Sequence, residues 1–489
     1  MSQDTLLVAP QAATSATPRS DREVSFIGNH EMASLDPNTW LTDSSSANMP
    51  LMRMVAPSLV LVDENFELQP GLAASWEPSA AFDRYRFVLR EDVTLHDGTP
   101  LDADLVVWNF ERIYDPRTNS TSPMDFQSLE GVRAVDKRTV EFRFSRPFPA
   151  FPYHLPWSAH ITSDSSIQPV GAGPYRVIEW VRGSHVRFER FDRYYEAGWP
   201  QVDSILLRFA PHGPQRLQLI KNGEADVVEG VSAKTIPELR EAGLLDIASV
   251  KSARKMIVAF NCKRPPFNDV QVRKAVAHAI DRETIRRDFY GDHARPLHAG
   301  YPVGDFWAAD VEPYAYDPDR ARHLLKAAGH DRIAVPHGIT TNVAPTPAVA
   351  ARIAEYLRVV GIDLSLTGYE DPPWWPFTYL THDWQLAVQN FPARPHPEVL
   401  FRRDHGTGGP FNGTHYSNPK LDRMLEQAQT LWDRAAQKRA YDDVQGVLHE
   451  DLPILPLLSP DVIVGTKPGF TGFRPHPLQY VDLTRLQRK

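Results

Sequence analysis

The stretch that decides the fold is residues 85–109, YRFVLREDVTLHDGTPLDADLVVWN. In its first part, apolar residues alternate with mostly basic ones, which predicts a strand with one buried face. Its centre is His96-Asp97-Gly98-Thr99-Pro100, where Asp can hydrogen-bond its own backbone, Gly accepts a positive φ and Pro sets the next bend. His96 and Asp97 are also residue types of an acid–base pair, but the turn residues around them favour a structural turn.

Strand and helix signals follow one another along the rest of the chain. A hairpin is predicted to turn at Arg182-Gly183-Ser184. Helices are predicted to begin near Asp269, at Asp317-Pro318, at Thr346-Pro347, after Asn418-Pro419 and near Ala435, with Gly329 and Gly361 as stops of the second and third. The chain is therefore expected to be mixed α/β, with a strand-rich early part and an α/β late part.

Bulk composition indicates a globular chain with more than one lobe. At 489 residues the chain exceeds what one hydrophobic core usually supports. Its apolar fraction of 42% and charged fraction of 23% are ordinary, and no apolar run approaches the roughly 18 residues of a membrane span. A formal net charge of -8 gives no electrostatic footprint for nucleic acid. The single cysteine, Cys262, excludes an intrachain disulfide.

Residues 1–22 are rich in Ala, Ser, Thr and Pro, and we expect this N-terminal segment to be disordered. A complete secretory signal would show a basic region followed by roughly 7–15 apolar residues, which this segment does not contain. Leu6-Leu7-Val8-Ala9 is consistent with the tail of a truncated signal.

A series of short motifs resembles one known family, in the order in which that family uses them. The matching segments are Ser34-Leu35-Asp36-Pro37 and residues 68–77 (LQPGLAASWE), 90–100 (REDVTLHDGTP), 171–175 (GAGPY), 222–226 (NGEAD), 265–273 (PPFNDVQVR) and 416–422 (YSNPKLD). From about Glu23 onward the chain is therefore similar to the peptide/opine/nickel class of solute-binding proteins that serve ABC importers, the bacterial extracellular solute-binding proteins of family 5.

The resemblance implies an α/β, two-lobed periplasmic-binding-protein-like fold of class II (cluster C type), with an inserted subdomain and an interlobe ligand cleft. Lobe I would be assembled from residues 23–47, 168–262 and 458–489. Residues 48–167 would form the inserted subdomain, and residues 263–457 would form lobe II. Hinge strands near Phe260 and Leu457 would let the lobes close over a solute.

Motifs for catalysis or cofactor binding are missing from the sequence. Gly171-Ala172-Gly173 is followed at once by Pro174 and lacks the third glycine of a dinucleotide-binding turn. His449-Glu450-Asp451 lacks the second histidine of a zinc-protease helix, and the eighteen histidines are dispersed. We therefore predict no catalytic residues, no metal site and no cofactor.

The loop from Trp384 to His396 carries the sequence evidence about the ligand. Peptide-binding members of the family have a loop that resembles W-x-A-D-x-x-[DE]-P, whose first acidic residue binds a free α-amino group. When this chain is aligned on Pro397, Asn390 stands in place of the tryptophan and Ala393 in place of the aspartate. His396 replaces the acid before the proline, so the anchor for a cationic amine is missing here.

Arg394 stands beside the missing acid, and two interpretations of it stay open. If it faces the cleft, its planar guanidinium suits a carboxylate, a phosphate or a sugar diol. Otherwise it is a loop residue that faces solvent or pairs with Asp371 or Glu398.

Large aromatic side chains near the expected cleft are further candidates, because they can bury apolar faces of a ligand or stack on planar groups. We expect one of the adjacent pair Trp374 and Trp375, which lies among prolines, to face the cleft. Trp384, Phe391 and Trp40 complete the candidates, with packing in the core as the alternative for each.

These expectations describe a monomeric, extracytoplasmic solute-binding protein without catalytic activity, which delivers a small polar solute to an ABC permease complex. The candidate solutes are a modified peptide, an opine-like or anionic conjugate, a glycoside and a chelated metal. A soluble ligand sensor of the same fold and a hydrolase or metal-dependent enzyme are the alternatives. The expected ligand-binding residues are Arg394, Asn390, Phe391, His396, Trp374, Trp375, Trp384 and Trp40.

Overall fold

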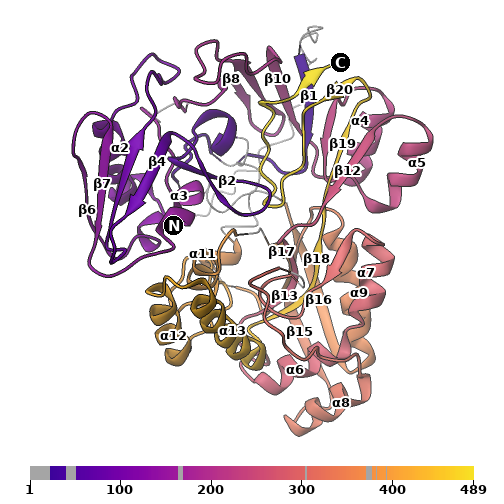
Figure 1. The fold of residues 1–489 in the computed structure, drawn as a ribbon. Helices are drawn as coiled ribbons and strands as arrows, with labels where there is room; N and C mark the ends of the chain where they lie inside the picture. The colour runs from indigo at the N-terminus through magenta and orange to yellow at the C-terminus, as the bar shows by residue number, and fades with distance from the viewer. Residues whose placement is uncertain are drawn as a thin grey trace, which may run out of the picture.

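The computed structural model describes residues 23–32, 34–39, 51–163, 169–302, 305–370, 377–381, 383–391 and 394–489. These residues form two large sheets, a four-stranded sheet and two short strand pairs, with helices packed against them (Figure 1). Each of the three larger sheets has a hydrophobic core of its own.

The first sheet has seven strands in the described residues. Their order is β12 (Asp246–Val250), β19 (Val462–Thr466), β11 (Val227–Glu229), β1 (Glu23–Gly28), β10 (Ser204–Phe209), β9 (His185–Arg190) and β8 (Tyr175–Val181). Strand β1 is buried along its whole length, because it pairs in parallel with β10 and β11 and both faces of the sheet are covered. Its side chains alternate, so Phe26 packs into one core cluster and Ile27 into another, beneath α4 (Gly213–Lys221) and α5 (Ile236–Glu241).

The second sheet has six strands in the same part of the chain. Their order is β14 (Ala294–Pro296), β18 (Ile454–Pro460), β13 (Lys255–Phe260), β17 (Leu386–Phe391), β15 (Ile333–Thr341) and β16 (Ile362–Tyr369). One face is packed by α6 (Val270–Ala279), α7 (Arg282–Tyr290), α8 (Pro318–Ala327) and α9 (Thr346–Val359). Strands β15 and β17 run parallel, which places their carboxyl ends at the same edge.

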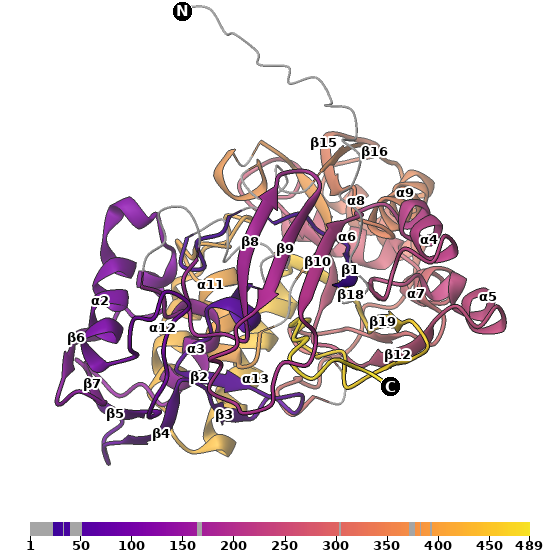
Figure 2. The same cartoon turned by 90° about the horizontal axis from the view of Figure 1, so that it is seen from above.

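The four-stranded sheet lies at the opposite end of the molecule from α4 and α5 (Figures 1 and 2). Its order is β4 (Ala73–Pro78), β5 (Arg84–Leu89), β7 (Thr139–Phe144) and β6 (Leu129–Ala134), and it packs with α2 (Ala103–Tyr114) and α3 (Phe151–Ser158). Strand β5 buries alternate residues, as its pattern predicted. Helices α11 (Pro397–His405), α12 (Pro419–Gln429) and α13 (Arg434–Asp451) lie beneath this subdomain (Figure 1).

The HDGTP segment is a structural turn, which confirms the sequence interpretation. Gly98 has a φ of 91° and donates its amide to Leu95, while the Thr99 amide donates to the Asp97 carboxylate. His96 points away from this carboxylate, with Nε2 3.0 Å from the Gly173 carbonyl oxygen, and burial lowers its pKa to about 4. A neutral, half-buried imidazole of this kind ties the turn to the neighbouring segment.

Local signals also predicted the helix ends correctly. Helix α8 begins after Asp317, whose side chain accepts from the Arg320 amide, and Gly329 follows its end with a φ of 84°. Gly361 ends the turn after α9 in the same way, with a φ of 93°. The predicted hairpin at residues 182–184 joins β8 to β9.

The chain crosses between the two large sheets twice in the described residues. Residues 251–254 connect β12 to β13, and Asp461 alone separates β18 from β19. Both crossings lie a few residues from the expected hinge positions at Phe260 and Leu457. The exact boundaries of the lobes and of the inserted subdomain stay a prediction.

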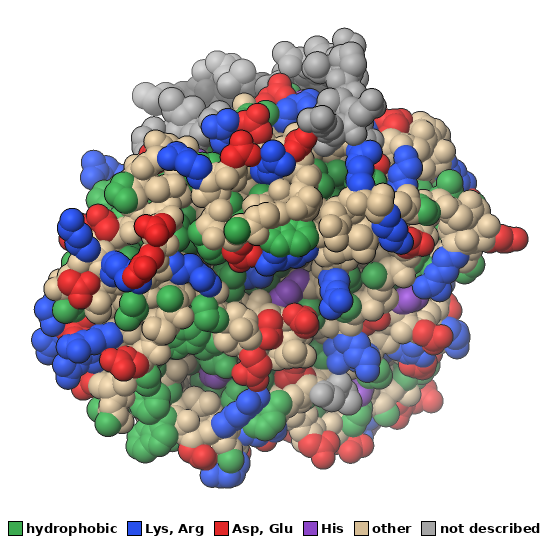
Figure 3. Space-filling view, turned by 45° about the horizontal axis from the view of Figure 1, so that its top comes forward, with side chains coloured by type: hydrophobic (Ala, Val, Ile, Leu, Met, Phe, Trp, Pro, Cys, Tyr) green, Lys and Arg blue, Asp and Glu red, His purple; other side chains and the backbone are tan. Residues whose placement is uncertain are grey.

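The face of the molecule in Figure 3 carries acidic and basic side chains intermingled, with no extended area of one sign. This mixture agrees with the small formal net charge of -8 on 489 residues. No helix among the described residues is long and apolar enough to cross a bilayer.

Candidate ligand-binding site

A cavity of about 540 Å³ lies between the two large sheets. Its walls come from residues at and just after the ends of β1 and β11 in one sheet and of β15 in the other, from Asn390 within β17, and from the first residues of α4 and α9. In open α/β sheets, ligands bind outside the carboxyl ends of the strands, where loops leave a crevice. The described part of the chain therefore builds a binding cavity at the place where this topology favours one.

The inner wall of the cavity is polar and comes from distant segments. Glu229 ends β11, Arg254 ends the first crossing and Gln479 belongs to the C-terminal segment. The Gln479 side-chain amide donates to the Glu229 carboxylate, and the Arg254 Nε lies 3.4 Å from the side-chain oxygen of Asn390. Burial raises the pKa of Glu229, against the opposing effect of nearby cationic groups. Hydrogen-bonding side chains of both sheets are thus presented to one space.

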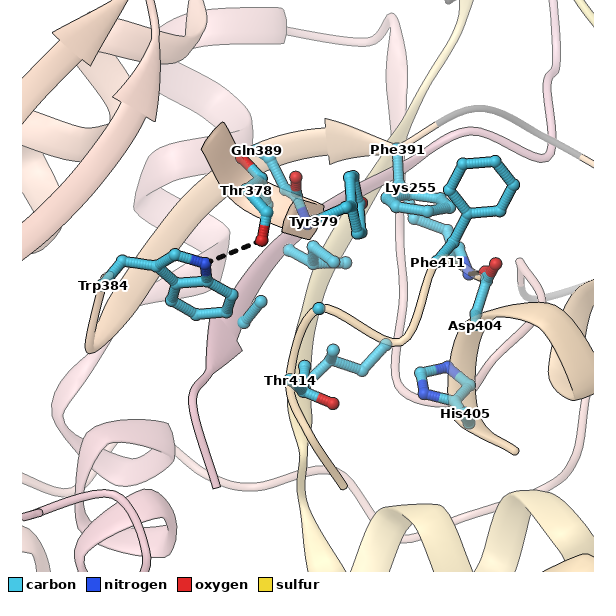
Figure 4. A pocket seen from close by; sticks show the side chains of 14 residues that line it. Lys255, Thr378, Tyr379, Trp384, Gln389, Phe391, Asp404, His405, Phe411 and Thr414 are labelled. Atoms are coloured by element: carbon cyan, nitrogen blue, oxygen red, sulfur yellow. Dashed lines mark hydrogen bonds and ion pairs between the residues drawn. The ribbon is translucent and has the colours of Figure 1, made fainter. Parts of the chain in front are cut away.

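A smaller pocket lies on the other side of β17 (Figure 4). Lys255 and Asp404 meet there as a buried ion pair, with Nζ 3.4 Å from Oδ2, and the Lys255 ammonium lies 5.2 Å from the centre of the Phe391 ring. His405 also lines this pocket, and burial lowers its pKa to about 3, so its imidazole is neutral at pH 7.

Two neighbouring candidates, Asn390 and Phe391, point to opposite sides of β17 because side chains alternate along a strand. Asn390 lines the interlobe cavity, whereas Phe391 lines the smaller pocket. Trp384 also borders the smaller pocket; it is buried, and its indole Nε1 donates to the Thr378 carbonyl at 3.0 Å (Figure 4). The Trp384 side chain thus packs in the second lobe, which was the alternative interpretation for it.

Arg394 lies at the contact between the second lobe and the inserted subdomain. Its guanidinium carbon is 3.6 Å from the centre of the Trp157 ring, and its side chain is only 2% exposed. That burial excludes the solvent-facing interpretation. One of its expected partners, Glu398, instead binds Arg402 at 2.8 Å, and Asp371 lies outside the described residues. Arg394 is absent from the described residues that line the interlobe cavity.

His396 packs at the same contact and begins α11. Its Nδ1 accepts from the Glu398 amide at 3.2 Å, and its ring stacks on Tyr153 with the ring centres 4.9 Å apart. Burial lowers the pKa of His396 to about 3, so the neutral ring acts as a helix cap. The remaining candidates, Trp40, Trp374 and Trp375, lie outside the described residues.

Sequence reasoning missed the residues that form the polar inner wall of the cavity. Glu229 left a faint signal, an acidic residue directly after two apolar residues and before Gly230. Asn29 and Gln479 left none, because both are ordinary surface residue types in loops far apart in the sequence. Among the described residues, no group of three or more His, Cys, Asp or Glu side chains could hold a metal ion.

Comparisons with known proteins agree with this architecture. The glutathione-binding protein GsiB of Pectobacterium atrosepticum is 26% identical over 471 residues, which cover 88% of each chain. The peptide transport periplasmic protein SapA of Salmonella typhimurium is 28% identical over 94% of this chain and 90% of its own. A solved dipeptide-binding protein from a Pseudoalteromonas species, in complex with Met-Leu, has a TM-score of 0.87 at 21% identity and covers 96% of this chain and 100% of that one.

The structural likeness confirms the predicted two-lobed α/β fold, and the relatives support the predicted solute-binding role. A family model described as bacterial extracellular solute-binding proteins, family 5 Middle, matches residues 67–413. This match spans most of the 489 residues, and the chain therefore belongs to the bacterial extracellular solute-binding proteins of family 5.

Proposed function

We propose that this protein captures a small polar solute in the cavity between its two large sheets and delivers it to an ABC permease. One observation carries the proposal: the cavity of about 540 Å³ takes its walls from both sheets. In the part of the chain that the structure describes, residues 251–254 and Asp461 are the direct connections between these sheets, so a rotation about two short segments would open and close the cavity. A ligand that contacts both walls stabilises the closed form by its extra contacts there.

The size of the cavity limits the solute to a small molecule, since sites for such ligands typically span about 300–1,000 Å³. GsiB is named for glutathione and SapA for peptide transport, and the solved relative holds the dipeptide Met-Leu. A solute of two or three residues, or a conjugate of that size, matches the cavity. We propose further that the protein works as a monomer outside the cytoplasm and leaves its ligand chemically unchanged.

The experiment is a ligand screen by thermal shift and isothermal titration calorimetry. The probes are dipeptides such as Met-Leu, glutathione, opine-like conjugates and glycosides. A true ligand at 100 times its Kd raises the free energy of unfolding by about 2.7 kcal/mol, which moves the melting temperature measurably. Ligand recovered intact after incubation supports binding without catalysis. Failure of every probe class to bind would overturn the proposal.

A further inference from the structure

The carboxylate of Glu229 is the most unusual polar group on the cavity wall. The residue ends β11, where its backbone pairs with Val464 of β19. Its two predecessors in the strand are buried apolar residues, and Glu229 itself is 8% exposed while lining the cavity. A carboxylate so deeply buried is costly unless hydrogen bonds or a positive charge compensate it.

The described residues compensate Glu229 only in part. Gln479 donates one hydrogen bond to it, but no Lys, Arg or His nitrogen of the described residues lies within 4.0 Å. The nearby Arg216 is not available, because its guanidinium donates to the backbone carbonyls of residues 210, 211 and 230 at 2.7, 2.8 and 3.1 Å. The carboxylate therefore retains capacity for a donor from the cavity.

Two more acceptor oxygens belong to the same wall. The side-chain amide nitrogen of Gln479 donates to Glu229, so the side-chain oxygen of Gln479 is the atom that can accept a hydrogen bond from a ligand. That oxygen and the side-chain oxygen of Asn29 are both buried and have no hydrogen-bond partner among the described residues. Asn29 lies against Gly230, the residue after Glu229. Buried acceptors without donors are rare in folded proteins, and a bound ligand is one of the ways to satisfy them.

We propose that Glu229, Gln479 and Asn29 bind a protonated amino group of the solute. An ammonium group carries three donors and a positive charge, which matches one carboxylate and two amide oxygens. The inference rests on the proposed function and narrows its ligand to an amine-bearing solute. It also places the amine anchor on the first lobe, whereas the family loop at residues 390–397 would have placed it on the second.

The cationic groups near Glu229 are His30, Arg254 and Arg216, and the two arginines do not compete with an amine for this anchor. The charge of Arg216 is shared with three carbonyl oxygens. Arg254 lies beside Asn390, on the wall that belongs to the second sheet, and its guanidinium suits a carboxylate of the same solute. A zwitterion would thus contact both walls at once, with its amine on the first lobe and its carboxylate toward the second.

The test compares matched probes on matched variants. Met-Leu and glutathione are titrated beside their N-acetylated forms into the wild-type protein, Glu229→Gln and Glu241→Gln. Glu241 is an exposed acid on α5, so its variant controls for the loss of one charge. Removing one partner of a buried charged hydrogen bond typically costs 2–5 kcal/mol, so N-acetylation should weaken wild-type binding on the order of 100-fold.

Glu229→Gln should weaken binding of the free amines by a similar factor and leave the affinity for N-acetylated probes almost unchanged. Wild-type binding of the N-acetylated probes at full affinity would refute the anchor, as would full affinity of Glu229→Gln for the free amines. The wild-type comparison needs no variant, so it stands even if Glu229→Gln fails to fold. Tight binding of solutes without an amine would refute the anchor alone, whereas no binding of any probe would overturn the proposed function with it.

Discussion

Replacing Asp125 by asparagine should destabilise the contact between the inserted subdomain and the second lobe. Arg403 on α11 forms an ion pair with Asp125 across this contact, and both side chains are only 1% exposed. Ser158 also donates to the Asp125 carboxylate, and Arg403 reaches the Thr121 hydroxyl at 3.2 Å. The pair is therefore removed from water and fixed by its neighbours.

The expected loss of unfolding free energy follows from the Arg403 charge, which the substitution leaves buried without its partner. An asparagine cannot neutralise the buried Arg403, and breaking a buried pair in this way typically costs about 3–5 kcal/mol. Unfolding by urea, followed by tryptophan fluorescence at pH 7, measures the change. Asp115→Asn is the control, because its partner Arg117 is 90% exposed and such surface pairs contribute little.

The pH dependence of the unfolding free energy gives a second measurement on the Asp125–Arg403 pair. Although burial opposes ionisation, Arg403 and His154 hold the pKa of Asp125 at about 2, below its ordinary 3.8. A depressed carboxyl pKa contributes stability above pH 3.8, and that contribution is lost as the pH falls toward 2. The difference in unfolding free energy between wild type and Asp125→Asn should thus shrink as the pH falls from 3.8 toward 2. A cost under about 1 kcal/mol at pH 7, the range of exposed pairs, would refute the reasoning.

Three further substitutions test other parts of the structure. His396→Asn keeps a side chain that can cap α11 but removes a group whose folded pKa of about 3 lies below its ordinary 6.5. Below pH 6.5 this residue lowers the free energy of unfolding of the wild-type protein by up to about 1.4 kcal/mol per pH unit. Urea unfolding at pH 7 and pH 5 should therefore show a smaller change of unfolding free energy with pH in the variant. Gly173→Ala should lower the free energy of unfolding by about 1–3 kcal/mol in the same assay, because the added methyl group would overlap the Met54 carbonyl. Gly446→Ala is the control: it has open space around it and should be neutral or stabilising. Arg394→Ala should lower the free energy of unfolding by about 2 kcal/mol, because its guanidinium no longer stacks on Trp157. The Kd for any identified solute should change less than it does in Glu229→Gln. A larger loss of binding free energy than of unfolding free energy would place Arg394 in the ligand site instead.

Local structure was predictable from the sequence because its signals act over a few residues. The turn at Asp97-Gly98-Thr99, the cap at Asp317 and the stop at Gly329 depend on side chains that hydrogen-bond neighbouring amides or on backbone angles that glycine accepts. Such interactions need no distant partner, so the residues alone specify them. The motif order over residues 34–422 also placed the chain in its family before any contact was known.

The polar inner wall of the cavity could be recognised only in the tertiary structure. Asn29, Glu229 and Gln479 lie on three segments that become neighbours only because β1 and β11 pair within one sheet and the C-terminal segment reaches the end of β11. Arg394 shows the same limit: its position in the loop left two interpretations open, and its packing on Trp157 could not be predicted from the sequence. The sequence by itself determined the α/β class, the family and the local turns and caps, because these depend on short-range chemistry. The tertiary structure alone decided which polar groups face the cavity, because long-range strand pairing brings them there.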